Sequence, residues 1–328
     1  MMLGSPMILA SAAILLGFII LVWSAGKFVD GAAATASHFG MPSLLVGMVI
    51  VGFGTSAPEM VVSAMAALDG KPDLALGNAL GSNIVNTGLI LGVTALIAPL
   101  LVSSKIVNKE IPLLIAICLL LGGLLWDGSL SRVDAIILLI GFFMVVGWSI
   151  YSGLKNKDDS LSQEFEAELK EKVMPIGRAI FWLILGFALL LASSRLLVWG
   201  AVNVAQALGV SDLIIGLTIV ALGTSLPELA ASVAAVRKGE HDIAIGNVVG
   251  SNMFNLLAVV GIAGVIAPMP TFAPEVLTRD WTTMLGLTVL LLAMAFRFKK
   301  QGRINRVEGG VLLALFAVYN SYLVYSVI

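Results

Sequence analysis

The sequence has few charged residues. Of its 328 residues, 12% are charged and 59% are hydrophobic, and the mean hydropathy is +1.03. Soluble domains carry charge on about a quarter of their residues, so this composition excludes a soluble protein and indicates an integral membrane protein. A spanning helix needs about 20 apolar residues. We predict ten spans, near residues 7–23, 43–67, 74–98, 111–125, 133–151, 179–199, 213–236, 243–267, 281–296 and 307–325.

Cysteine and histidine are also scarce. The single cysteine, Cys118, excludes an intramolecular disulfide and a cysteine-based metal cluster. His38 and His241 both fall in predicted connectors, which argues against a histidine metal site within the membrane. No HExxH sequence occurs and no aspartate pair lies at membrane depth, so an intramembrane protease is disfavoured. We predict a protein that is not an enzyme, has no cofactor, is surrounded by membrane lipid and binds no nucleic acid; no protein partner is indicated.

One long motif occurs twice. GTSAPE at 54–59 precedes GNALGSNIVN at 77–86, and GTSLPE at 223–228 precedes GNVVGSNMFN at 246–255. Matching residues are 169 positions apart, and 23 of the 53 residues in 47–99 are identical to those in 216–268. Such duplication is typical of transporters built from two halves. We expect one five-helix repeat at 1–154, a charged cytoplasmic linker at 155–175 and a second repeat at 176–328.

Lysine and arginine are distributed unequally between the two sides of the predicted layout. Fifteen lie in connectors on one side and four on the other, so the middle connector is expected in the cytoplasm and both termini outside it. Five spans, an odd number, separate each element from its copy, so the halves cross the membrane in opposite directions. The predicted fold is an all-α polytopic membrane protein of about ten transmembrane helices in two inverted five-helix repeats.

Two glutamates lie near the middle of predicted spans. A charge at the centre of a lone helix costs about 2.5 to 3.5 kcal/mol, and neither the span with Glu59 nor that with Glu228 has a lysine or arginine at similar depth. Protonation or a bound cation must offset that charge. Because Pro58 and Pro227 cannot donate a backbone hydrogen bond, each helix should break or kink around its Gly-Thr-Ser segment and free backbone carbonyls.

Hydroxyl and amide side chains accompany each glutamate. Thr55 and Ser63 share a helical face with Glu59, and the second copy repeats the pattern. An all-oxygen environment suits hard cations such as Ca²⁺ or Na⁺. Four asparagines are candidates either for ligands or for polar contacts between helices, namely Asn78, Asn83, Asn247 and Asn252.

Other repeated residues have structural interpretations. The two GxxxG spacings, Gly77 with Gly81 and Gly246 with Gly250, are expected to permit close helix packing. Asp73 and Asp242 also repeat, each in N-cap position for the helix that follows it, and we expect them to cap those helices.

The paired G-[TS]-S-x-P-E and GNxxGSNxxN segments resemble the two alpha repeats of the sodium/calcium exchanger family, in the cation/Ca²⁺ antiporter superfamily, and specifically its prokaryotic members. The resemblance covers both repeats and implies a prokaryotic inner membrane location. It also implies alternating access, with the first and sixth spans sliding across the core. The cation ligands that it implies are Glu59, Glu228, Thr55, Ser56, Ser82, Asn86, Thr224, Ser225, Ser251 and Asn255.

Three transport functions fit the sequence to different degrees. The leading hypothesis is a secondary antiporter that exchanges Na⁺ for Ca²⁺ by alternating access at a midplane site around Glu59 and Glu228. A proton-coupled exchanger of Ca²⁺ or another cation is the alternative, because carboxyl groups in a low-dielectric site can carry protons. A cation channel is disfavoured, since broken helices in inverted repeats are typical of transporters and no repeated selectivity-filter loop is visible.

Overall fold

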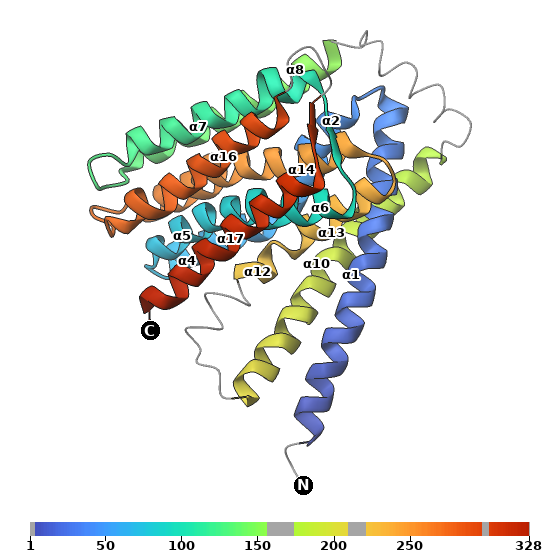
Figure 1. The fold of residues 1–328 in the computed structure, drawn as a ribbon, viewed down its shortest axis with the longest axis horizontal. Helices are drawn as coiled ribbons and strands as arrows, with labels where there is room; N and C mark the ends of the chain where they lie inside the picture. The colour runs from blue at the N-terminus through green and yellow to red at the C-terminus, as the bar shows by residue number, and fades with distance from the viewer. Residues whose placement is uncertain (1–3, 156–173, 209–220, 297–301, 328) are drawn as a thin grey trace.

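The computed structural model describes residues 4–155, 174–208, 221–296 and 302–327, and these are almost entirely helical (Figure 1). The predicted charged linker therefore falls largely outside the described residues, as does the start of the seventh predicted span. The remaining elements follow the predicted order. An all-α membrane fold with two repeats is confirmed.

The first half of the chain contains five helical regions, and its second and third regions are interrupted by π-helical turns or breaks. Its elements are α1 (Gly4–Phe39); α2 (Ser43–Leu45), η1 (Val46–Val51), α3 (Gly52–Thr55) and α4 (Ala57–Leu68); α5 (Pro72–Ile84), η2 (Val85–Ile90) and α6 (Leu91–Ile97); η3 (Ile106–Glu110) and α7 (Ile111–Leu124); and α8 (Arg132–Lys155).

The second half repeats this order. Its elements are α10 (Ile176–Ala207); α12 (Ala221–Thr224) and α13 (Leu226–Arg237); α14 (His241–Phe254), η6 (Asn255–Val259) and α15 (Val260–Ile266); η7 (Val276–Trp281) and α16 (Thr282–Ala295); and α17 (Arg306–Val327). Two short strands, β1 (Leu100–Val102) and β2 (Gly302–Ile304), pair antiparallel before α17 begins.

Seven described helices are long and apolar enough to cross a membrane, or eight if the bent pair of η1–α3 and α4 is one span. These eight correspond to predicted spans one to six, eight and nine. The described part of the seventh consists of α12 and α13, and α17 occupies the place of the tenth.

Two sequence expectations about helix limits are wrong. The first predicted span ends near residue 23, but α1 continues to Phe39 and includes the supposed connector. Residues 24–39 contain no proline and no glycine with positive φ, and the φ of 60° at Gly40 ends the helix. Asp73 and Asp242 lie inside the first turns of α5 and α14, after Lys71 and Glu240 in the N-cap positions, so neither occupies the cap.

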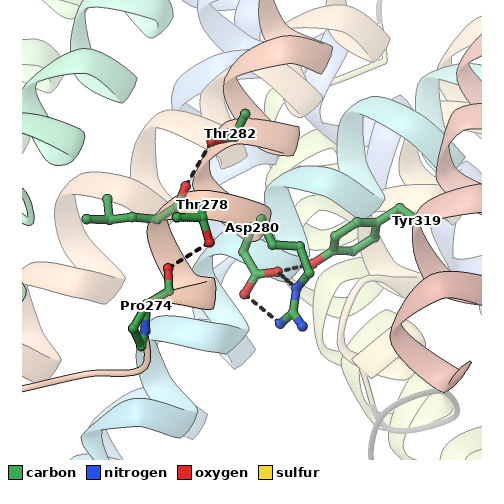
Figure 2. Close-up of polar contacts among 7 residues, drawn as sticks. Pro274, Thr278, Asp280, Thr282 and Tyr319 are labelled. Atoms are coloured by element: carbon green, nitrogen blue, oxygen red, sulfur yellow. Dashed lines mark hydrogen bonds and ion pairs between the residues drawn. The ribbon is translucent and has the colours of Figure 1, made fainter. Parts of the chain in front are cut away.

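The two halves are intertwined. The fifth helix of each packs against the third region of the other, α17 against α6 and α8 against α15. The close approach of α17 to α6 depends on Gly92, where a Cβ would lie 3.0 Å from the Gly309 carbonyl oxygen. At the start of α16, Asp280 in η7 accepts a 2.7 Å hydrogen bond from the Tyr319 hydroxyl of α17 (Figure 2). These contacts fix the helices that surround the central regions.

Helices α1 and α10 form a pair of their own, side by side and extending away from the other helices (Figure 1). A Cβ at Gly17 would lie 3.0 Å from Leu197, and one at Gly186 would lie 2.7 Å from the backbone nitrogen of Phe28. Gly186 and Leu197 are each 169 residues from Gly17 and Phe28, so the same contact occurs twice. Glycine thus brings these two helices into backbone contact.

Candidate functional site

Both central glutamates lie in the first turn of a helix that starts at a break. α3 ends at Thr55, and the helical segments on the two sides of the break are inclined at 42°. Pro58 lies in the first turn of α4, where its missing N–H is not needed. The second copy breaks in the same way, between Thr224 and the helix that contains Pro227. The predicted breaks are confirmed.

The two carboxyl groups face hydroxyls of the opposite repeat. Glu59 and Glu228 are each 1% exposed, and neither forms an ion pair within the described residues. The Thr55 side chain interacts with the carboxyl of Glu228, which also accepts a 3.5 Å hydrogen bond from Ser56 Oγ. The Thr224 side chain lies near the carboxyl of Glu59, although neither Glu59 oxygen accepts a hydrogen bond within the described residues. The two glutamates are also close enough to interact electrostatically, so two acidic side chains lie near each other at the breaks.

Two asparagine pairs join the repeats at the segments η2 and η6, which pack against the glutamate helices α13 and α4. Asn86 Nδ2 donates a 3.0 Å hydrogen bond to Asn252 Oδ1, and Asn255 Nδ2 donates one of 3.1 Å to Asn83 Oδ1. The two pairs are related by the 169-residue offset. Each pair uses the amide nitrogen of a predicted ligand and leaves its oxygen for another partner.

Buried oxygens without a partner are concentrated at the predicted ligands. A buried polar atom that lacks a hydrogen bond costs about 1 to 3 kcal/mol, so such atoms are rare and call for a physical reason. Within the described residues, six of these oxygens belong to predicted ligands: Glu59 Oε1 and Oε2, Glu228 Oε2, Asn86 Oδ1, Asn255 Oδ1 and Ser225 Oγ. The other unpartnered buried atoms lie elsewhere in the fold: the hydroxyl oxygens of Thr35 and Ser103 and the ring nitrogen Nδ1 of His241.

The remaining predicted ligands lie in the same segments. Ser251 is fully buried and its Oγ donates a 3.3 Å hydrogen bond to the Gly52 carbonyl. Ser82 is buried on α5, one turn before Asn86. All ten predicted residues therefore come from the two breaks and from the α5–η2 and α14–η6 junctions. Nine of them are buried, and Thr224 is half-buried.

Asn78 and Asn247, for which the sequence allows either a ligand role or a polar contact between helices, both bond to a neighbouring helix. Asn78 Nδ2 donates to Ser63 Oγ at 3.1 Å, and Asn247 Nδ2 donates to Ser232 Oγ at 2.8 Å. Their side chains thereby join the glutamate helices α4 and α13 to the helices that follow them. These contacts favour the role of polar contact between helices.

Two further polar residues, Thr87 and Ser194, contact the segments of the site but are not predicted from the sequence. Thr87 accepts a 2.9 Å hydrogen bond from Asn252 Nδ2, and Ser194 of α10 donates one of 3.0 Å to the Gly223 carbonyl at the second break. The positions equivalent to them are Leu256 and Ala25, so comparison of the repeats gives no signal for either residue.

Close packing at the second GxxxG spacing supports these junctions. A Cβ at Gly246 would lie 2.9 Å from the Leu44 carbonyl oxygen, and one at Gly250 would lie 2.6 Å from that of Met48. The packing role predicted for these glycines is confirmed. For Gly77 and Gly81 the equivalent facing segment, residues 213–217, lies outside the described residues, so the same prediction stays open there.

Comparison with known proteins gives one consistent result. The family model described as sodium/calcium exchanger protein matches residues 9–151 and 178–325. The putative antiporter CaxA of Alkalimonas amylolytica is 48% identical over 321 residues, which cover 98% of this chain and 100% of CaxA. The inner membrane protein YrbG of Escherichia coli K12 is 39% identical over 302 residues, which cover 90% of this chain and 91% of YrbG. A structure of the sodium-calcium exchanger NCX_Mj soaked with Na⁺ and Ca²⁺ superposes with a TM-score of 0.81 at 30% identity, covering 95% of this chain and 97% of that one.

Proposed function

Because the chain belongs to the sodium/calcium exchanger protein family and is a transporter rather than an enzyme, we propose that it exchanges Na⁺ for Ca²⁺ across the membrane. Cation/Ca²⁺ antiport is the activity of the family. The finer proposal is that Na⁺ is the coupling ion and that both ions bind in turn between Glu59 and Glu228.

The cluster of unpartnered buried oxygens carries this proposal. Carboxylate, amide and hydroxyl oxygens from both repeats lack hydrogen-bond partners among the described residues, and the segments that carry them pack together, α4 against η6 and α13 against η2. Ca²⁺ takes about 6 to 8 oxygen ligands, and an all-oxygen set suits Na⁺ as well. The proposed ligands are the ten residues predicted from the sequence: Thr55, Ser56, Glu59, Ser82, Asn86, Thr224, Ser225, Glu228, Ser251 and Asn255.

The charge of this site gives a reason for coupled exchange. Two carboxylates neutralise one Ca²⁺ or two Na⁺, so either load leaves the site without net charge. The empty site has two buried negative charges, and moving them through the low-dielectric interior is costly. Reorientation of the loaded site is therefore favoured, and the two ions exchange because they compete for the same oxygens.

We propose that access alternates through movement of α1 and α10. Their glycine contacts make them a unit, and Ser194 of α10 bonds to the Gly223 carbonyl beside the proposed ligands. A Cβ at Gly54, at the other break, would lie 3.3 Å from Phe187 of α10. Movement of this helix pair would therefore change contacts at both breaks.

The proposed setting is a prokaryotic cell membrane. The distribution of lysine and arginine supports a cytoplasmic linker at 155–175 and termini that both lie outside the cytoplasm. The proposed division is a first repeat at 1–154 and a second, inverted repeat at 176–328.

Coupling is tested by ⁴⁵Ca²⁺ uptake into proteoliposomes loaded with Na⁺, with K⁺-loaded vesicles and an imposed proton gradient as controls. Uptake is expected only with internal Na⁺, and Glu59→Gln with Glu228→Gln should abolish it. Uptake driven by the proton gradient would instead establish the proton-coupled alternative. Ca²⁺ entry without any counter-gradient would contradict exchange.

A further inference from the structure

Asn83 and Asn252 are outside the proposed ligand set, but each contacts a proposed ligand of the opposite repeat. We propose that they are positioning residues, which turn the oxygens of Asn255 and Asn86 toward the cation. The inference rests on the proposed function and adds residues that determine cation affinity. Both are 1% exposed and lie deep between the α5–η2 and α14–η6 regions.

The orientation of the Asn83 amide is fixed by a backbone group. Its Nδ2 donates a 3.1 Å hydrogen bond to the Asn252 carbonyl and lies 3.6 Å from Met284 Sδ. A backbone carbonyl can only accept, so the nitrogen of Asn83 must point to it and Oδ1 must point away. Oδ1 in turn accepts only from a donor, which Asn255 supplies through Nδ2.

These two hydrogen bonds of Asn83 determine which atom of Asn255 is available to a cation. An amide can rotate to present either its oxygen or its nitrogen, and only the oxygen is a ligand for Ca²⁺ or Na⁺. With Nδ2 held by Asn83, the oxygen is presented, and Oδ1 of Asn255 is buried without a partner among the described residues.

Asn252 holds Asn86 in the corresponding way. Its Oδ1 accepts from Asn86 Nδ2 at 3.0 Å while its own Nδ2 donates to Thr87 Oγ1 at 2.9 Å. Thr87 lies in η2, the π-helical turn that also contains Asn86. A hydroxyl can either donate or accept, so this second pair is less strictly fixed than the first, and Asn83 is the sharper test.

The geometry also explains why both halves are needed. Each proposed amide ligand is oriented by an asparagine of the other repeat, and the two pairs cross between them. Outer-shell partners that orient ligands typically contribute about 10- to 100-fold to metal affinity. We therefore expect Asn83→Ala to raise the Kd for Ca²⁺ by about tenfold.

A double-mutant cycle separates positioning from a general structural effect. Equilibrium binding of ⁴⁵Ca²⁺ is measured on purified wild-type protein, Asn83→Ala, Asn255→Ala, Asn86→Ala and the double variants. The rise in Kd caused by Asn83→Ala should nearly vanish in the Asn255→Ala background and persist in the Asn86→Ala background. Asn252→Ala should show the reverse dependence, and it replaces Asn83→Ala if that variant does not fold.

An Asn83→Ala effect of equal size in both backgrounds would overturn the positioning role, because a structural defect does not depend on which amide remains. The binding assay needs no coupling ion, so dependence of uptake on protons would leave this test intact while refuting Na⁺ coupling. Absence of Ca²⁺ binding to the wild type would refute the proposed function itself, and the positioning role with it.

Discussion

Thr55 of the first repeat donates a 3.0 Å hydrogen bond to Asn247 Oδ1 of the second. The same asparagine donates to the backbone carbonyl of Glu228 at 3.1 Å and to Ser232 Oγ at 2.8 Å. Its hydrogen-bonding atoms are thus engaged with protein groups on two helical segments, α3 and α13. One side chain thereby links the first break to α13, whose first turn contains Glu228, and the shape of the proposed cation site depends on contact between the halves.

Close packing of α14 against η1 should be essential for stability. A Cβ at Gly250 would lie 2.6 Å from the Met48 carbonyl oxygen, so Gly250→Ala forces two backbones apart. Overpacking typically costs about 1 to 3 kcal/mol, and thermal unfolding in detergent should shift down by several degrees. Gly286→Ala is the matched control, because its Cβ meets nothing within 4 Å among the described residues. An equal shift for both variants would contradict this packing account.

The hydrogen bond between Tyr319 of α17 and Asp280 of η7 should contribute to stability without affecting ion binding. Asp280 accepts hydrogen bonds from the Tyr319 hydroxyl at 2.7 Å and from Arg279 Nε at 2.7 Å (Figure 2). A hydrogen bond to a charged group contributes about 1.5 to 3 kcal/mol, so Tyr319→Phe should lower the unfolding temperature.

The control for Tyr319→Phe is Tyr322→Phe, since Tyr322 is 56% exposed on the same helix. Its unfolding temperature is expected to match the wild type, and Ca²⁺ affinity should be unchanged in both variants. A marked loss of Ca²⁺ affinity in Tyr319→Phe would show that this cluster takes part in ion binding.

The ion pair between α1 and the α13–α14 turn should restrain movement of α1. Lys238 Nζ lies 2.6 Å from Asp30 Oδ1 and 2.6 Å from the Gly26 carbonyl. The two side chains are 33% and 38% exposed, so the pair is worth about 1 kcal/mol at most. If α1 must leave this turn during transport, Lys238→Met should raise the rate of Ca²⁺ uptake by up to about fivefold.

The charge swap Asp30→Lys with Lys238→Asp restores the attraction and should return the rate to that of the wild type. High ionic strength should reproduce part of the Lys238→Met effect, because salt screens exposed pairs. A slower rate in Lys238→Met, or a swap no closer to wild type than the single variants, would contradict the restraint.

The order of the helices and the positions of the two breaks can be predicted from the sequence, because the repeated motifs and the prolines are visible in it. Pro58 and Pro227 mark the breaks, and the shared motifs identify the regions that meet. The sequence underestimates the length of α1, because the charged residues Lys27 and Asp30 interrupt the apolar run after residue 23. In the fold, Asp30 is paired with Lys238, a residue 208 positions away.

The orientation of the side-chain amides of Asn86 and Asn255 cannot be predicted from the sequence. Which atom of Asn86 or Asn255 is available depends on partners in the other half, Asn252 and Asn83. Thr87 is even harder to find, because the second copy has no hydroxyl at its position. Such features follow from how the halves are placed, and not from the residues near them in the chain.

Competition between Na⁺ and Ca²⁺ tests directly whether both ions bind at the proposed site. Equilibrium ⁴⁵Ca²⁺ binding to the purified protein is measured while Na⁺ is increased, for the wild type and for Glu228→Gln. A shared site predicts that each chain binds one Ca²⁺, that Na⁺ displaces this ion and that Glu228→Gln loses the binding. Ca²⁺ binding that persists in saturating Na⁺, or that Glu228→Gln leaves unchanged, would contradict a shared site between Glu59 and Glu228.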